Sequence, residues 1–240
     1  RDNRITVTGR RFVEADPGYR PYAFGIFMSV GGGPNEISGN TFTVDQRDPP
    51  NSEKHGAYAI FIGGSDQGGI YHHNRIVANT TPVWMGTYYG VARNVLFHDN
   101  AIVAAKGSEP FVPFKLGWYK SPTEDIGFYS NTFTGLDFAV GIEDYTTGYV
   151  SQYTVGWTLR VTAKPGAEIQ VEDAAGTAVA KGTADGEGRW SQRLPERHER
   201  GDGRDGNRQR LVTRDVSAYS VRVGETVKEI SLTKDLDLRF

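Results

Sequence analysis

A lysine, a tyrosine and two carboxylates form the first set of residues that could carry out acid–base chemistry. Lys115 lies within a short apolar run, Tyr119 follows it, and Glu143 and Asp144 come directly after the next run of the same type. An amine can remove a proton from carbon or neutralise a substrate carboxylate, and a carboxylic acid can protonate a leaving oxygen. We therefore predict a catalytic set in which Lys115 is the base or neutralising cation and Glu143 or Asp144 the general acid. The alternative is a surface ion pair of Lys115 with Glu143, worth less than about 1 kcal/mol.

Aromatic side chains near this set predict a binding surface. If the apolar runs are strands, alternation of side chains places Phe27, Phe61, Trp84 and Lys115 in one outward row. The adjacent outward row contains mostly small residues: Ser29, Gly63, Gly86, Gly117 and Glu143. A sugar ring packs its apolar face on an aromatic ring, and glycine lets a polymer approach the backbone. The alternative is that long loops or the C-terminal segment cover these rings.

The turns after these runs contain further predicted substrate contacts: Tyr88, Tyr89, Trp118 and Lys120. Asp66 is another, because with Glu143 or Asp144 it would form a carboxylate pair able to hydrolyse a glycosidic bond. The long insertion 45–58 also precedes one of the runs, and it is either functional or a tolerated surface loop.

Two histidines occupy equivalent places in neighbouring repeats. His72 and His98 each precede an asparagine by two residues, so they should stack, and His73 and Asp99 should lie side by side. Such a group could bind a divalent metal or transfer protons, but like side chains stack routinely in repeat proteins, and we assign no metal ligand here. We also predict no cofactor, except that Asp202 and Asp205 in the charged segment 197–210 could hold calcium. The alternative is that this segment is a solvated loop.

A repeated asparagine pattern predicts the framework that positions these residues. An apolar residue stands three positions before each repeat position and another stands two after it. The repeat positions are Arg10, Asn40, Asn74, Asn100, Asn131 and Tyr153, with the first and last as degenerate ends. The spacing varies while the local pattern is constant, which predicts fixed corners joined by loops of different length. In stacked strands, corner asparagines can hydrogen-bond to one another.

The asparagine corners and the apolar runs that separate them resemble the right-handed parallel β-helix of the pectin-lyase-like superfamily, over about residues 1–155. The resemblance implies an all-β fold with five to six coils in a domain 1–156, and a substrate groove along the face that carries Lys115. The enzyme motifs of that superfamily are absent: Asn-Thr-Asp, paired Asp-Asp, Gly-His-Gly, Arg-Ile-Lys and Arg-x-Pro-x-x-Arg. A β-sandwich with accidental repeats is the alternative fold.

The composition changes after the last repeat. From Trp157 the chain reads as alternating strands separated by turns at 164–166, 174–176 and 185–188. This part is similar to bacterial Ig-like and carboxypeptidase-regulatory-like modules, which implies a β-sandwich accessory domain over 157–240. Such a domain could cover the last coil.

The composition excludes several classes of protein. The chain has 240 residues, a formal charge of −2 and no cysteine, which argues against nucleic-acid partners, disulfides and thiolate sites. The sequence has no long apolar run, so we expect no membrane span. The chain begins at Arg1, so we expect a processed fragment, with a preceding β-helix segment or another chain capping the first coil.

Together these features predict a secreted or cell-surface bacterial protein that acts on an acidic polysaccharide. Lyase β-elimination is the leading reaction. Glycoside hydrolysis by paired carboxylates is one alternative, and non-catalytic polysaccharide binding by an adhesin or matrix protein is the other.

Overall fold

The computed structural model describes residues 1–9, 22–28, 33–47, 56–63, 66–86, 92–117, 123–142, 151–205 and 208–240. Every regular element in these ranges is a β-strand, which confirms the all-β prediction. None of these ranges contains a helix that is long and apolar enough to cross a membrane.

The chain forms two compact units. The first unit comprises Arg1–Ile126, Asn131–Gln152 and Arg200–Leu211, and the second comprises Gly127–Ser130, Tyr153–Glu199 and Val212–Phe240. The domains 1–156 and 157–240 stay predictions.

Short parallel strands make up the first unit, and they recur in the same order along the chain. The first sheet contains β1 (Arg4–Gly9), β4 (Thr41–Gln46), β8 (Arg75–Ala78), β12 (Ala101–Ala104) and β16 (Thr132–Thr134). The second sheet contains β2 (Tyr22–Met28), β5 (Gly56–Ile62), β9 (Val83–Met85), β13 (Phe114–Leu116) and β17 (Val140–Ile142). The third sheet includes β3 (Glu36–Ser38), β7 (Ile70–His72) and β11 (Leu96–His98). The fourth sheet contains β6 (Asp66–Gln67), β10 (Ala92–Arg93) and β14 (Thr123–Glu124).

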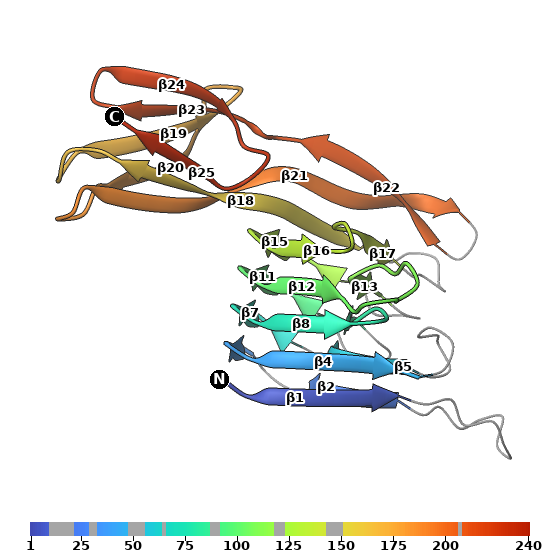
Figure 1. Cartoon of the computed structure of the whole chain (residues 1–240). Coiled ribbons are helices and arrows are strands. Elements are labelled where there is room, and N and C mark those ends of the chain that lie inside the picture. Colours follow the sequence, from blue (N-terminus) through green and yellow to red (C-terminus); the bar gives the residue numbers. More distant parts are fainter. Residues whose placement is uncertain are drawn as a thin grey trace, which may run out of the picture. The chain divides into compact units, whose positions relative to one another are not determined.

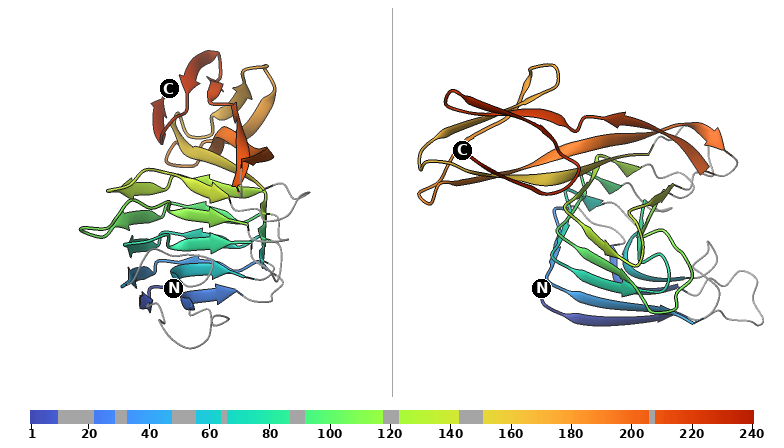
Figure 2. Two further views of the ribbon diagram at one scale, coloured as in Figure 1. Left: turned by 90° about the vertical axis from the view of Figure 1, so that its right-hand side faces the viewer. Right: turned by 45° about the horizontal axis from the view of Figure 1, so that its top comes forward.

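Register turns the period-two alternation of each strand into continuous buried rows. Phe42 pairs with Ile76 and Ile76 with Ile102 across the first sheet, and all three are buried. In the second sheet Ile60 pairs with Val83, which pairs with Phe114, again all buried. Figure 1 shows β4, β8 and β12 as successive arrows that point the same way, and the left view of Figure 2 shows the stacked layers from another side. Each strand therefore continues the buried apolar row of the strand before it.

Corner asparagines form a continuous hydrogen-bonded row. The backbone N–H and Nδ2 of Asn40 donate to Oδ1 of Asn74 at 3.0 Å, and those of Asn74 donate to Oδ1 of Asn100 at 3.0 Å. Asn100 donates in the same way to Asn131, at 3.0–3.1 Å. The predicted stacking of these four residues is confirmed.

The two ends of the predicted row differ from the prediction. Asn3 is the residue that precedes Asn40, since its N–H and Nδ2 both donate to Oδ1 of Asn40 at 3.0 Å. Arg10, the predicted first position, lies outside the described residues. Tyr153 lies within a long strand of the second unit, where its ring packs against that of Phe128 at 5.7 Å. The first residue of the row is thus identified by its side-chain amide. The spacing of apolar residues alone is compatible with more than one starting residue.

Left-handed backbone conformations mark one corner at each asparagine of the row and a second corner in three of the repeats. The residue before each asparagine has a φ between 52° and 70°: Asp2, Gly39, His73, Asp99 and Ser130. A second set, with a φ between 53° and 79°, lies one or two residues before β7, β11 and the next strand of the third sheet, β15 (Ile126–Tyr129): Gly68, Asn94 and Asp125. These conformations bend the chain sharply, and glycine, asparagine and aspartate tolerate them better than other residues.

The second unit contains an antiparallel sheet and a parallel strand pair. The sheet has the order β20 (Ala178–Thr183), β19 (Glu168–Asp173), β23 (Ala218–Val223) and β24 (Thr226–Ser231). β18 (Gln152–Thr162) pairs in parallel with β25 (Leu236–Arg239). The remaining strands are β15 (Ile126–Tyr129), β21 (Arg189–Asp205) and β22 (Arg208–Asp215).

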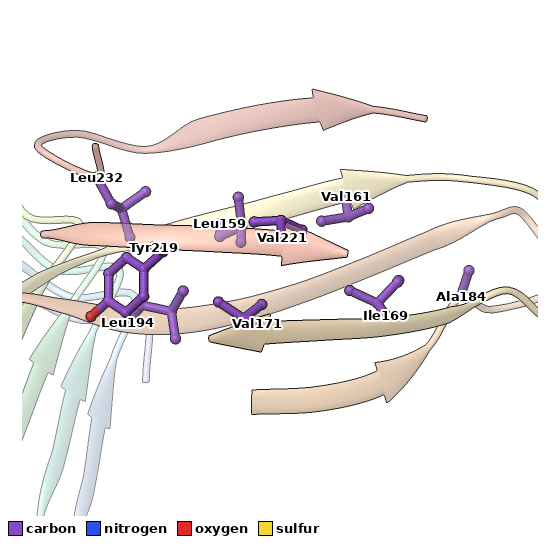
Figure 3. Close-up of a cluster of buried hydrophobic side chains, with 9 residues drawn as sticks. All are labelled: Leu159, Val161, Ile169, Val171, Ala184, Leu194, Tyr219, Val221 and Leu232. Atoms are coloured by element: carbon purple, nitrogen blue, oxygen red, sulfur yellow. The ribbon is translucent and has the colours of Figure 1, made fainter. Parts of the chain in front are cut away.

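Nine buried side chains, seven of them on these strands, form the core of the second unit (Figure 3): Leu159, Val161, Ile169, Val171, Ala184, Leu194, Tyr219, Val221 and Leu232. Leu159 and Val161 come from β18, while Ile169 and Val171 come from β19 and alternate with more exposed residues. The phenol of Tyr219 donates to the carbonyl of Pro195 at 2.7 Å, which satisfies the one polar atom in this group of side chains.

Candidate functional site

The second sheet aligns the predicted outward row as the sequence indicated. Phe27 pairs with Phe61, Phe61 with Trp84, Trp84 with Lys115, and Lys115 with Gly141. These residues are thus true neighbours across successive strands, although they are far apart in the sequence.

Most of this row is buried in an aromatic cluster. Phe27 is 45% exposed, whereas Phe61 is 6% exposed and Trp84 is 0% exposed. Phe61 meets the indole of Trp84 edge-on at 4.9 Å, and the other rings of the cluster are Tyr22, Phe24 and Tyr58. The ring faces of Phe61 and Trp84 are therefore covered, and their contact with a substrate stays a prediction.

A bulge explains the aromatic neighbours that sequence reasoning missed. The N–H groups of Ala59 and Ile60 both donate to the carbonyl of Pro82, at 2.8 and 3.2 Å. Two consecutive donors on one acceptor are typical of a β-bulge, which shifts the alternation of side chains. Tyr58 consequently joins Phe61 on the face of Trp84, at 5.3 Å from the indole. Gly25 lies opposite the bulge, and a Cβ at this position would lie 2.7 Å from the carbonyl oxygen of Ala59. This glycine is therefore the sequence feature that could have indicated the bulge.

Lys115 is held against the aromatic cluster. Its Nζ lies 4.1 Å from the centre of the Trp84 ring, and the residue is 8% exposed. The indole N–H of Trp84 in turn donates to the carbonyl of Gly117 at 3.2 Å. The cation–π contact holds the ammonium group of Lys115 against the indole of Trp84, beside the middle of strands β9 and β13.

The carboxyl ends of the strands of the second sheet lie at one edge, because the strands are parallel. Gly86 and Gly117, which directly follow β9 and β13, both have a φ of 75°, and this turns the chain away from the sheet. The segments that follow β9, β13 and β17 contain the other predicted site residues: Tyr88, Tyr89, Trp118, Tyr119, Lys120, Glu143 and Asp144. These seven lie outside the described residues.

Asp66 lies in the interior of the first unit. It is 0% exposed, and it aligns with the buried Ala92 and Thr123 across the fourth sheet. The phenol of Tyr71 donates to its Oδ2 at 2.7 Å, and Nδ2 of Asn35 donates to its Oδ1 at 3.2 Å. Burial raises the pKa of the Tyr71 phenol, and the negative charge of Asp66 raises it further. The described geometry thus gives Asp66 hydrogen bonds inside the fold, and its part in substrate binding or hydrolysis stays a prediction.

The predicted histidine stack is present in the first unit. The rings of His72 and His98 lie 4.8 Å apart and within 9° of parallel, and His73 meets His72 edge-on at 4.9 Å. Nδ1 of His98 lies 2.6 Å from a carboxylate oxygen of Asp99, and Nε2 of His72 lies 3.1 Å from one of Glu36. The side chains of the predicted calcium ligands Asp202 and Asp205 lie outside the described residues.

Comparisons with known proteins assign no family. No protein-family model matches the chain, and no curated protein matches it. A search of solved structures finds similarity to the Bacillus anthracis TIE protein, with a TM-score of 0.23 and 12% sequence identity. The match covers 43% of this chain and 18% of that one, and likeness at this level carries no argument about fold or function.

Proposed function

We propose that the first unit is a right-handed parallel β-helix of the pectin-lyase-like type and that the second is a β-sandwich accessory domain. Parallel in-register pairs in four sheets and the continuous asparagine row support the first part of this proposal. The second part is supported by the core to which strands β18 and β19 both contribute.

We further propose that the protein is directed at an acidic polysaccharide outside the cell, at the secreted or cell-surface location predicted above. The observation that carries this proposal is the composition of the three successive segments that leave the carboxyl edge of the second sheet. They contain six aromatic residues and Lys120: Tyr88, Tyr89, Trp118, Tyr119, Tyr145 and Tyr149. Aromatic rings provide packing surfaces for sugars, and a lysine provides charge for uronate carboxylates. Lys115, the middle residue of β13, is a second cation on the strand that precedes one of these segments.

Lyase β-elimination is the reaction that we propose for this edge. A base removes the proton from the carbon next to the uronate carboxylate, a carbon–carbon double bond forms, and the bond to the leaving glycosidic oxygen breaks. A general acid gives that oxygen its proton. Lys115 would neutralise the carboxylate or act as base, Tyr119 would assist, and Glu143 or Asp144 would be the acid. The fixed position of Lys115 over Trp84 favours the neutralising role, because packing holds its ammonium group at one place.

Binding and turnover can be tested separately with the whole chain. The protein is incubated with a panel of uronate polymers and with an uncharged glucan, while the absorbance of unsaturated chain ends and the bound fraction are measured. We expect binding to the uronate polymers alone, weakened at least tenfold by Trp118→Ala and unchanged by Ile70→Ala, which alters an exposed residue of the third sheet. Binding without the formation of unsaturated chain ends would reject the proposed lyase activity and favour a non-catalytic polysaccharide-binding protein. Absence of binding to every polymer would reject both.

A further inference from the structure

Three histidines from two neighbouring strands converge at the corner after the third sheet. His72 ends β7, His73 follows it, and His98 ends β11, which pairs with β7 in register. Each imidazole offers one nitrogen, and these three nitrogens lie within 4.8 Å of one another. Among the described residues, this is a group of three potential metal ligands that the proposed polysaccharide site does not use.

Carboxylates orient two of the three rings. Nε2 of His72 lies 3.1 Å from Oε1 of Glu36, and Nδ1 of His98 lies 2.6 Å from Oδ2 of Asp99. A metal-binding histidine commonly gives its second ring nitrogen to a carboxylate, which sets the tautomer and makes the ligating nitrogen more basic. In this arrangement His72 presents Nδ1 to an ion and His98 presents Nε2.

The contact between the first two histidines supports the same conclusion. Nδ1 of His72 lies 2.6 Å from Nδ1 of His73, so one of these rings donates its N–H to the other. A divalent cation can take the place of that proton. Zinc–nitrogen bonds of about 2.0–2.1 Å put tetrahedral ligand atoms roughly 3.3 Å apart, and the three nitrogens here lie within 4.8 Å of one another. The nearly parallel rings of His72 and His98 must turn toward each other to bind one ion.

We propose that His72, His73 and His98 bind one divalent transition-metal ion of the zinc type, with Glu36 and Asp99 as the carboxylates that position two of the ligands. The two nearby carboxylates, of which Glu36 is also paired with Arg1, offset part of the charge of such an ion. Neutral nitrogen ligands suit zinc, copper and nickel, whereas calcium and magnesium require oxygen ligands. His98 is buried and His73 is exposed, so the site reaches solvent on one side.

The backbone around the histidines holds the two corners that carry them in place. His72 and His98 stand two residues before Asn74 and Asn100, whose hydrogen bonds fix the two corners relative to each other. An ion bound there links β7 to β11 and stabilises their stacking. This inference does not depend on the proposed polysaccharide function.

The test is metal binding by the whole chain after removal of any affinity tag and of bound metal. Zn²⁺ is titrated calorimetrically and Co²⁺ by its visible absorption, and thermal unfolding is followed with and without Zn²⁺. We expect one equivalent of Zn²⁺, a tetrahedral Co²⁺ spectrum and a higher unfolding midpoint in the presence of Zn²⁺.

Variants distinguish this site from adventitious binding. His73→Asn keeps the left-handed conformation accessible, since asparagine tolerates a φ of 53°, and it removes one ligand. We expect it to weaken Zn²⁺ binding at least tenfold, and Asp99→Asn to weaken it about 10–100-fold through loss of ligand positioning. His198→Asn, in the second unit, is the matched control and should leave affinity unchanged. Absence of Zn²⁺ binding, or equal affinity in His73→Asn, His98→Gln and the unaltered chain, would overturn the proposal.

Discussion

The asparagine row makes a quantitative prediction about stability, and Asn100→Ala is its sharpest test. Asn100 is 2% exposed, and its Oδ1 accepts the backbone N–H and the Nδ2 of Asn74 at 3.0 Å. Its own Nδ2 donates to Oδ1 of Asn131 at 3.0 Å and to the carbonyl of Tyr71 at 2.9 Å. The substitution removes all four hydrogen bonds. At about 1 kcal/mol for each buried hydrogen bond, the free energy of unfolding of the first unit should fall by about 4 kcal/mol.

Asn3→Ala is the matched control, because Asn3 stands at the end of the same row. Its side chain makes one row bond, from Nδ2 to Oδ1 of Asn40, and a second bond to the carbonyl of Arg1, and both atoms of this second pair are exposed. The backbone N–H of residue 3 keeps its bond to Asn40 after the substitution. The expected loss is therefore about 1 kcal/mol or less.

Urea unfolding, followed by far-ultraviolet circular dichroism and tryptophan fluorescence, measures both losses. The two units can unfold in separate transitions, so the comparison uses the transition that reports on Trp84 in the first unit. Equal and small losses in Asn100→Ala and Asn3→Ala would show that the row contributes little, and the hydrogen-bond reasoning would be refuted.

Three further predictions concern single residues of the first unit. Tyr71→Phe removes the phenol that donates to the buried carboxylate of Asp66, and urea unfolding should show a loss of about 1–3 kcal/mol; no loss would mean that Asp66 finds another donor. A hydrogen bond from Arg1, followed by one from the neighbouring histidine, lowers the pKa of Glu36 to about 2. The stability that this carboxylate contributes should be present above its unfolded-state pKa of 4.5 and be lost as the pH falls toward 2. Glu36→Gln should therefore make the free energy of unfolding depend less on pH between these values. A titration of Glu36 by NMR with an ordinary carboxyl pKa would contradict this. Gly117→Ala forces a side chain into a φ of 75° and should cost about 1–2 kcal/mol, and an unchanged denaturation midpoint would show that the turn can relax.

The repeated pattern was enough to predict the stacked rows. Asn40, Asn74 and Asn100 each have an apolar residue three positions before them and another two positions after them. Their alignment therefore follows from one spacing pattern that recurs along the chain. The rows of the second sheet follow from alternation in the same way, as the pairing of Trp84 with Lys115 shows. The all-β content and the parallel strands were therefore accessible from the sequence.

Features that depart from the strict alternation of side chains along a strand could not be predicted from the sequence pattern. The bulge at Ala59 moves Tyr58 to the face of Phe61, and a strict period of two places these residues on opposite faces. Asp66 belongs to a two-residue strand, which is too short for alternation to indicate whether its side chain points inward. Burial of Trp84 depends on rings from β2 and β5, and the sequence of β9 alone does not reveal these contacts.

The uniform hydrogen bonding of the asparagine corners makes one repeat interchangeable with the next. Asn74 and Asn100 are separated by 26 residues, and each accepts the same two donors from the preceding asparagine. Excising residues 74–99 would join His73 directly to Asn100 and offer Asn40 an identical acceptor, with Ile102 taking the place of Ile76 beside Phe42. Duplicating the same stretch would lengthen the stack by one layer. Such a chain can change its length by whole layers, and so gain or lose surface, without redesign of its interior.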